Sequence, residues 1–185
     1  MKIALIVIAV IVVLIVLYAA STYNSLIKLR NSVEEAFATM DVYLKKRWDL
    51  IPNIVSSIKG YAKHEVQTLE KVIAARNANY AGMTDNDKIA ANQEISKGLA
   101  SIYAVAEQYP DLKANQNFLD LNSQLKRTEE DIANARKYYN AVVKNYNNKI
   151  QMFPSSIIAS MFNFDKKQMF LIEDNNEKQA VKVEF

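Results

Sequence analysis

The chain has 185 residues, of which three are glycine, three are proline and none is cysteine. So few turn residues exclude a sandwich or barrel, and the lack of cysteine excludes disulfides, thiol catalysis and cysteine-ligated metals. The net charge of +3 is too small for a nucleic-acid-binding surface, which needs Lys and Arg gathered on one face. The composition therefore predicts an all-α protein built from long helices.

Residues 3–20 contain no charged residue, side-chain amide, glycine or proline. As a helix they would span about 27 Å, close to the hydrocarbon thickness of a bilayer. Tyr18 suits an interfacial aromatic position, and Lys2 can reach the headgroups at the other end. We therefore expect residues 1–20 to form a transmembrane anchor, with the lipid bilayer as the partner of residues 3–20.

A cleaved secretory signal is the alternative, with Lys2 as its basic region and Ala19-Ala20-Ser21 as its cleavage site. The apolar stretch is longer than a typical signal core, and a helical pattern continues beyond it, so an uncleaved anchor is favoured. Lys28 and Arg30 follow the anchor, whereas Lys2 precedes it. The positive-inside rule then leans towards a single-pass protein of the cell membrane with a cytoplasmic domain.

Apolar residues at alternating steps of three and four predict an elongated antiparallel four-helix bundle in residues 21–164. Its seams have the spacing of a coiled coil. The helices are expected at about 21–48, 50–77, 85–109 and 111–153. The first seam includes two arginines, Arg30 and Arg47, whose long side chains can cover apolar surface while the charge points outward.

Four residues mark the expected helix boundaries. Pro52 predicts a new helix after a turn at residues 49–52, and Gly60 is a candidate kink within that helix. Thr84 is a candidate N-cap for the third helix, and Pro110 ends it. In an up-and-down bundle the Gly82 loop and residues 153–164 should then face the membrane. The turns at 49–52 and Pro110 should lie some 40 Å away from it.

The apolar segment 153–164 is too short to span a bilayer. One interpretation is that it covers the open end of the bundle core. The other is interfacial docking beside the anchor, through the apolar side chains of Phe153, Ile157, Ile158, Met161 and Phe162. Residues 165–185 are expected to form a polar C-terminal tail, disordered from Glu173 onward.

Lys45, Lys46 and Arg47 form the tightest basic cluster, next to Trp48. One interpretation is a packed tryptophan flanked by solvated basic side chains. The other is a contact point for an acidic protein partner, at the end of the bundle far from the membrane.

The sequence contains no recognisable catalytic, cofactor or metal site. His64 lies beside Lys63 and Glu65 and has no nucleophile or orienting acid associated with it. The di-iron Glu-x-x-His pattern fails because residue 61 is tyrosine. The carboxylates at 34–35 and 129–131 are sequence neighbours that point about 100° apart on a helix, so we expect them to be solvated.

Several blocks of sequence resemble the LemA family of bacterial membrane proteins, over essentially the whole chain. The blocks are Tyr23-Asn24-Ser25-Leu26, Asp41-Val42, residues 45–53 (KKRWDLIPN), 59–65 (KGYAKHE), 109–118 (YPDLKANQNF), 135–140 (ARKYYN) and 153–159 (FPSSIIA). The resemblance implies a single-pass protein with a helical-bundle domain, and it brings no catalytic residues. Where many members have Arg-His, this chain has Arg47-Trp48, so no histidine role is expected there.

These observations favour a non-enzymatic, membrane-tethered interaction or scaffold module with a protein partner at the membrane and no cofactor. The alternative is a transmembrane sensor in which a continuous helix, residues 3–48, passes a shift or rotation across the bilayer. A ligand cavity between the helices would favour the sensor, and a solid core the scaffold. A homo-oligomer is compatible with the pattern but is not indicated by it.

Overall fold

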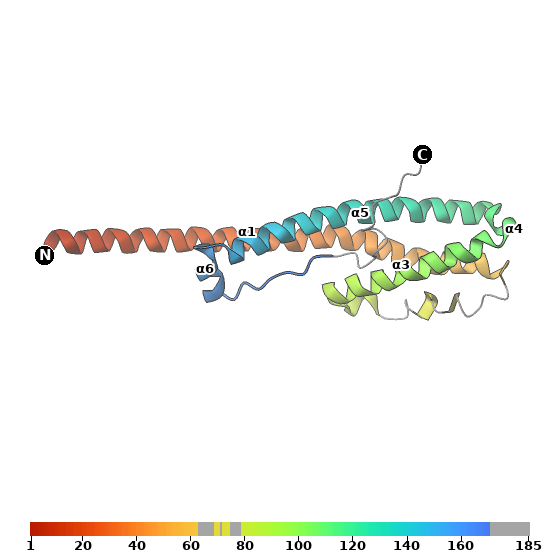
Figure 1. Ribbon diagram of the computed structural model, residues 1–185, viewed down its shortest axis with the longest axis horizontal. Coiled ribbons are helices and arrows are strands. Elements are labelled where there is room, and N and C mark those ends of the chain that lie inside the picture. The colour runs from red at the N-terminus through yellow and green to blue at the C-terminus, as the bar shows by residue number, and fades with distance from the viewer. Residues whose placement is uncertain (63–68, 71, 75–78, 171–185) are drawn as a thin grey trace, which may run out of the picture.

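The computed structural model describes residues 1–62, 69–70, 72–74 and 79–170. Its helices follow in the order α1 (Lys2–Lys59), the 3-10 helix η1 (Tyr80–Gly82), α3 (Asp85–Glu107), α4 (Pro110–Lys113), α5 (Gln116–Gln151) and α6 (Ser155–Met161). They form an elongated molecule with the N-terminus at one end and α4 at the other (Figure 1). The described residues include no strand, so the all-α prediction is confirmed for them.

α1 is a single helix of 58 residues that ends at Gly60, so the predicted turn at residues 49–52 is wrong. The helix continues through Pro52, although a proline in a helix interior costs about 3 kcal/mol. Four apolar side chains beside this proline are buried, and full burial of each contributes roughly 1.5–3 kcal/mol; they are Leu50, Ile51, Ile54 and Val55. Core packing therefore outweighs the cost of the proline.

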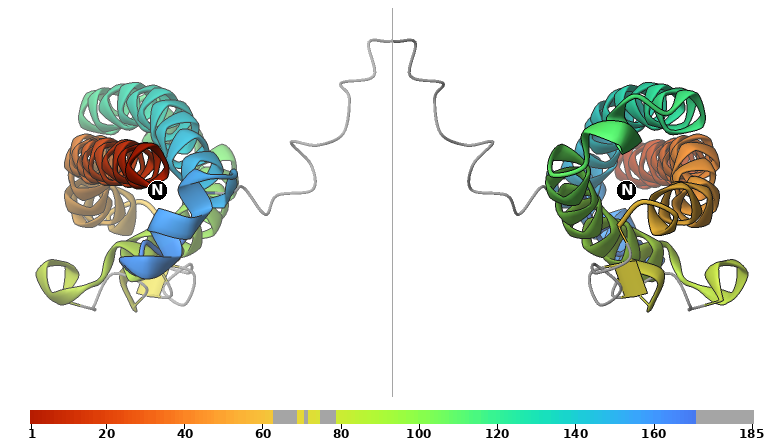
Figure 2. Two further views of the ribbon diagram at one scale, coloured as in Figure 1. Left: turned by 90° about the vertical axis from the view of Figure 1, so that its left-hand side faces the viewer. Right: turned by 90° about the vertical axis from the view of Figure 1, so that its right-hand side faces the viewer.

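α5 runs antiparallel to α1, and α3 covers the half of this pair that is farther from the N-terminus (Figure 1). Viewed along the long axis, the three helices lie on three sides of a common core (Figure 2). At the far end, the Asn115 side-chain amide donates to the Tyr61 hydroxyl at 2.9 Å, joining the start of α5 to the turn after α1. Of the predicted second helix at about 50–77, residues 50–59 belong to α1 and residues 69–70 and 72–74 are helical pieces separate from α1, while residues 63–68, 71 and 75–77 lie outside the described residues.

The third helix follows its prediction closely. Thr84 caps α3 by accepting a hydrogen bond from the Asp87 N–H, and the Asp87 carboxylate accepts one from the Thr84 N–H in return. Gly98 allows α3 to approach the short helical piece 72–74, because a Cβ on Gly98 would lie 3.1 Å from the Val72 side chain. α3 ends at Glu107, just before Pro110.

The Gly82 loop lies at the end of α3 that points toward the apolar stretch, but it stops well short of residues 3–20, so the expectation that it lies at a bilayer surface there is wrong (Figure 1). α3 has 23 residues and spans about 34 Å, whereas α5 has 36 and spans about 54 Å. Tyr80 packs on Trp48 with ring centroids 5.0 Å apart, and Trp48 lies about 42 Å along α1 from Ala20. α6 does lie at the expected end, beside Tyr23.

Residues 165–170, here called the strap, run as an extended segment along α5 where α3 no longer covers it (Figure 1). Asn147 donates to the Lys167 carbonyl at 2.8 Å and accepts from the Lys167 N–H at 3.0 Å. Asn140 makes the same pair of bonds with Phe170, at 2.9 and 2.8 Å. The strap therefore belongs to the folded domain, and a tail can begin no earlier than residue 171.

The two asparagines of α5 are separated by the same distance as the two strap residues that they bind. Asn140 and Asn147 are two helical turns apart, which is about 10.5 Å. Three residues of extended chain, the separation of Lys167 from Phe170, cover about 10 Å. Tyr139 and Tyr146, one position earlier in each turn, donate to strap carbonyls three residues apart, those of Gln168 at 2.8 Å and Asp165 at 2.9 Å. Burial raises the pKa of Tyr139 to about 12, which keeps its hydroxyl a donor at neutral pH.

We predict that the double variant Asn140→Ala, Asn147→Ala releases the strap. It removes four hydrogen bonds, each worth a net of about 1 kcal/mol, so the open population should rise at least tenfold. Limited trypsin digestion of the full-length chain in detergent, read by mass spectrometry, should then cut after Lys166 and Lys167 at least about tenfold faster.

Asn145→Ala is the matched control, because Asn145 is exposed on the same helix and gains the same helix propensity. Equal cleavage rates in the double variant and this control would contradict the clamp.

Candidate functional site

The basic cluster at residues 45–48 is divided between the surface and the core. Lys45 and Lys46 are exposed, and the Lys45 ammonium pairs with Asp49 one turn along. Arg47 is only 2% exposed and Trp48 only 3%. Consecutive helical residues point about 100° apart, so a run of four cannot lie on one face of the helix, and here the first two point to solvent and the last two to the core. Arg47 is therefore not available as a surface contact, and that part of the prediction is wrong. The cluster also lies partway along α1, about 20 Å before the helix ends at Lys59.

Arg47 joins α1 to both neighbouring helices. From α3, its guanidinium reaches the Asn92 carbonyl at 2.7 Å, the Asn92 side-chain oxygen at 2.8 Å and the Ser96 hydroxyl at 3.0 Å. From α5, Glu129 accepts two bonds from the Arg47 Nη1, at 3.0 and 3.1 Å. A buried cation is tolerated only when it is paired and hydrogen-bonded, and these contacts meet that condition.

The Arg47 contacts correct one expectation and place a polar residue in the core. Glu129 was expected to be a solvated carboxylate, but its side chain is only 40% exposed and pairs with Arg47. Asn92 is fully buried in the α3 seam, where its side chain also donates to the Lys88 carbonyl. Every buried side-chain nitrogen and oxygen among the described residues has a hydrogen-bond partner, so the buried polar atoms around Arg47 are all satisfied within the protein.

A second polar cluster fixes the start of α3 against α1. The Asp41 carboxylate accepts from the Lys88 ammonium and the Tyr80 hydroxyl, both at 2.6 Å. The Lys88 nitrogen also lies 5.1 Å from the centre of the Tyr80 ring, a cation–π distance. Burial, followed by the hydrogen bond to Asp41, raises the pKa of Tyr80 well above its ordinary value, so its hydroxyl remains a donor.

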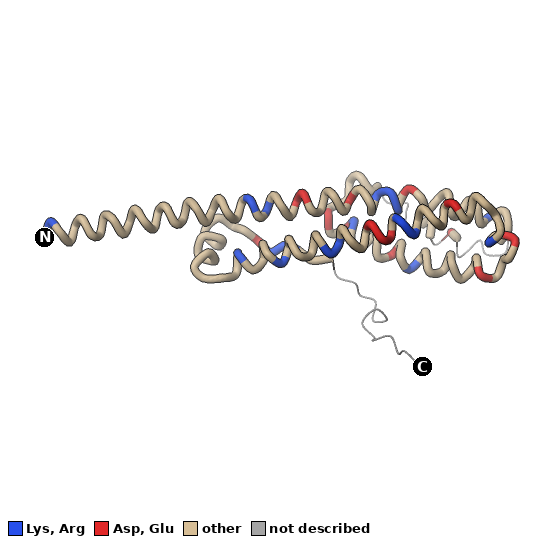
Figure 3. Tube along the Cα trace, turned by 90° about the horizontal axis from the view of Figure 1, so that it is seen from above, with Lys and Arg blue, Asp and Glu red and all other residues tan. Residues whose placement is uncertain are grey.

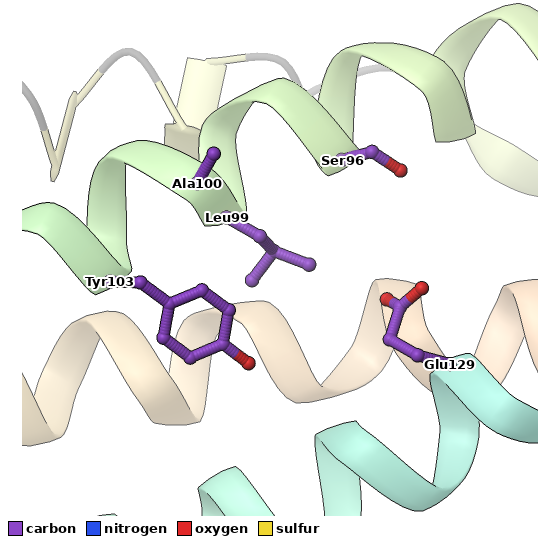
Figure 4. Close-up of a pocket in the computed structure, with 5 residues that line it drawn as sticks. All are labelled: Ser96, Leu99, Ala100, Tyr103 and Glu129. Atoms are coloured by element: carbon purple, nitrogen blue, oxygen red, sulfur yellow. The ribbon is translucent and has the colours of Figure 1, made fainter. Parts of the chain in front are cut away.

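A small hollow of about 210 Å³ lies beside Arg47, between α3 and α5. It is lined by Ser96, Leu99, Ala100, Tyr103 and Glu129 (Figure 4). Two of these residues, Ser96 and Glu129, already bond to Arg47. Burial and the nearby Glu129 raise the pKa of Tyr103, so its hydroxyl is a neutral polar group. The hollow is open to solvent and smaller than the roughly 300–1,000 Å³ of typical ligand sites.

The described residues offer no metal centre. They contain no group of three or more His, Cys, Asp and Glu side chains that could hold a metal ion. His64, the single histidine of the sequence, lies outside the described residues. The carboxylates Glu34 and Glu35 are exposed, and Glu34 lies 3.9 Å from Arg30 on the same helix.

The apolar segment after α5 has two faces. Ile158 is buried, together with Ala159 and Phe164, and covers the end of the core. Ile158 is therefore not available as a membrane contact, and that part of the prediction is wrong. The other predicted contacts are each more than half exposed; they are Phe153, Ile157, Met161 and Phe162. Sequence periodicity alone could not assign these faces, because the helix in this segment, α6 (Ser155–Met161), is only two turns long.

We predict that Arg47→Met lowers the free energy of unfolding by roughly 1–3 kcal/mol, because it leaves the buried side-chain oxygen of Asn92 without its hydrogen-bond donor. Glu129→Gln should also destabilise, by about 1 kcal/mol, because it leaves the buried Arg47 cation without its charged partner, although the carboxylate is partly solvated and the amide oxygen can still accept a hydrogen bond. The measurement is chemical unfolding of the full-length chain in detergent, followed by circular dichroism.

Lys46→Met is the matched control, an equivalent change at an exposed position of the same helix, and should stay within about 0.5 kcal/mol of the parent. An Arg47→Met loss no larger than this control would contradict the role given to Arg47.

Comparison with known proteins gives one consistent result. The LemA family model matches residues 36–185. The Protein LemA of Metamycoplasma hominis is 26% identical over 139 residues, which cover 74% of this chain and 63% of that protein. The chain thus spans less than two thirds of that relative's length. Since the family model covers most of the sequence, this chain belongs to the LemA family.

Proposed function

We propose that this protein is a membrane-anchored, non-enzymatic interaction module of the bacterial cell membrane. In this proposal residues 3–20 span the bilayer, and an elongated antiparallel helical bundle presents a protein-binding surface above it. The observation that carries the proposal is the composition of α1. One helix contains an apolar, wholly unburied stretch with a mean hydropathy of 3.4, followed by the buried seam of the domain.

The arrangement of polar groups supports an interaction role over catalysis. The buried charged and polar groups described above, Arg47 with Asn92 and Asp41 with Lys88, bond to each other and connect helices. Their donors and acceptors are used in holding the helices together, which suits a rigid support. Lys28 and Arg30, just beyond the apolar stretch, favour placing the domain on the cytoplasmic side.

The exposed face of α1 is the surface we assign to the protein partner. Val42 is 65% exposed and lies one turn before Lys46, on the side of α1 that faces solvent. Lys45 and Lys46 lie beside it and would favour an acidic partner, while Val42 supplies apolar contact area. This surface lies well away from residues 3–20, so a partner could reach it without touching the bilayer.

A sensor is the second candidate, favoured by the continuity of α1 through the apolar stretch and the whole domain. A helix without a break can transmit a small shift or rotation from one end to the other. The small open hollow beside Arg47 gives less support to this reading than an enclosed cavity would, so we place the scaffold role first.

The proposed surface can be tested with a photo-crosslinking amino acid at Val42 or Lys46 in living cells. We expect a discrete crosslinked product at both positions. With the crosslinker at Val42, Lys46→Glu should reduce the product several-fold by repelling an acidic partner, whereas Lys59→Glu, an exposed position at the end of α1, should not. A crosslinker at Leu119, exposed on α5, is the background control. No product above this background would count against the proposed surface.

A further inference from the structure

We propose that α6 is a second membrane contact, an interfacial helix that rests on the anionic headgroups beside the point where α1 enters the bilayer. This inference rests on the proposed function, because it needs residues 3–20 to span the membrane. It adds a named lipid-facing surface and the chemistry of the lipid that this surface would prefer.

The position of α6 gives the first argument. The Phe162 and Phe164 rings lie 4.7 Å and 5.8 Å from the ring of Tyr23. Tyr23 is three residues beyond Ala20, or about 5 Å along the helix. The headgroup region on each side of a bilayer is roughly 5–8 Å thick. With residues 3–20 in the hydrocarbon, α6 therefore lies at the depth of the headgroups.

The exposed face of α6 gives the second argument. Ile157 and Met161 are one turn apart and both more than half exposed, while Ile158 between them is buried against the domain. Met152 and Phe153, which lead into α6, are also more than half exposed. These apolar side chains gather at the end of the domain that adjoins residues 3–20. With that stretch in the bilayer, the membrane interface is the apolar environment closest to them.

Charge gives the third argument and indicates the kind of lipid. Residues 144–170, which comprise the last part of α5, α6 and the strap, contain Asp165 as their single acidic residue, against four basic ones: Lys144, Lys149, Lys166 and Lys167. On α1, Lys28 and Arg30 precede the first acidic residue after the apolar stretch, Glu34. Figure 3 shows basic positions predominating around α6. Basic residues within a Debye length of an anionic membrane each contribute about 1 kcal/mol of attraction.

The test uses the full-length chain, which lacks cysteine, reconstituted in lipid nanodiscs. Single cysteines at Ile157 or Met161 carry an environment-sensitive fluorophore. Nitroxide-labelled lipids then report contact with the bilayer, and aqueous iodide reports contact with water. Val10→Cys marks the apolar stretch, and Leu119→Cys, an exposed apolar position at the other end of α5, is the matched control.

We expect labels at Ile157 and Met161 to be quenched by nitroxide lipids and to be several-fold less sensitive to iodide than the label at Leu119. This protection should be larger with phosphatidylglycerol than with phosphatidylcholine alone. Iodide sensitivity equal to that of Leu119, with Val10 quenched by lipid, overturns the inference and leaves the anchor intact. Equal protection in both lipids overturns the anionic preference. A Val10 label that lipids do not quench overturns the anchor itself.

Discussion

α1 passes through Pro52 without turning because the apolar side chains on both sides of the proline are buried in the core. The missing backbone hydrogen bond is offset by that burial. As a result, the apolar stretch at residues 3–20 and the far end of the domain lie on one continuous helix. The positions of α3 and α5 follow from this, since both pack along the same helix. The strap in turn follows α5, to which it is hydrogen-bonded.

Arg47 decides how the other two long helices meet that rod. A buried guanidinium needs its donors satisfied, and here α3 and α5 supply the acceptors through Asn92, Ser96 and Glu129. Such a group contributes little net stability compared with apolar packing, but a slipped register would leave it without partners. We infer that Arg47 specifies the register of the three helices. The position of the strap is also fixed by polar pairing, since side-chain amides of α5 hydrogen-bond to its backbone.

Local sequence signals predicted the features that depend on a few adjacent residues. The Thr84 cap with Asp87 is a short-range pattern, and the inward residues of α3 from Ile89 to Ala106 follow a strict helical spacing, so both could be read directly. The spacing of apolar residues also predicts an α5 seam from Phe118 to Phe153 that includes Val142 and Lys149. The structure buries Val143 and Ile150 instead, on either side of the correctly placed Tyr146, because a helix with 3.6 residues per turn drifts against a seven-residue repeat.

Features that depend on tertiary packing could not be read in this way. Pro52 has the sequence context of a helix start, and only the burial of its neighbours shows that it lies inside a helix. The two arginines of the α1 seam look equivalent, yet Arg30 is exposed and Arg47 is buried, since Asn92 and Glu129 come from distant parts of the chain. The strap did leave a signal, because a Tyr-Asn pair recurs after seven residues, at 139–140 and 146–147.

The continuity of α1 is the central claim, and one distance tests it most directly. Nitroxide labels on cysteines at Lys28 and Ser56, both exposed on α1, can be measured by pulsed electron paramagnetic resonance in the full-length, nanodisc-embedded chain. An unbroken helix predicts a narrow distribution near 42 Å between the two backbone positions. A turn at residues 49–52 would fold Ser56 back beside the first part of the helix and give about 25 Å. A distribution centred near the shorter distance would contradict the account.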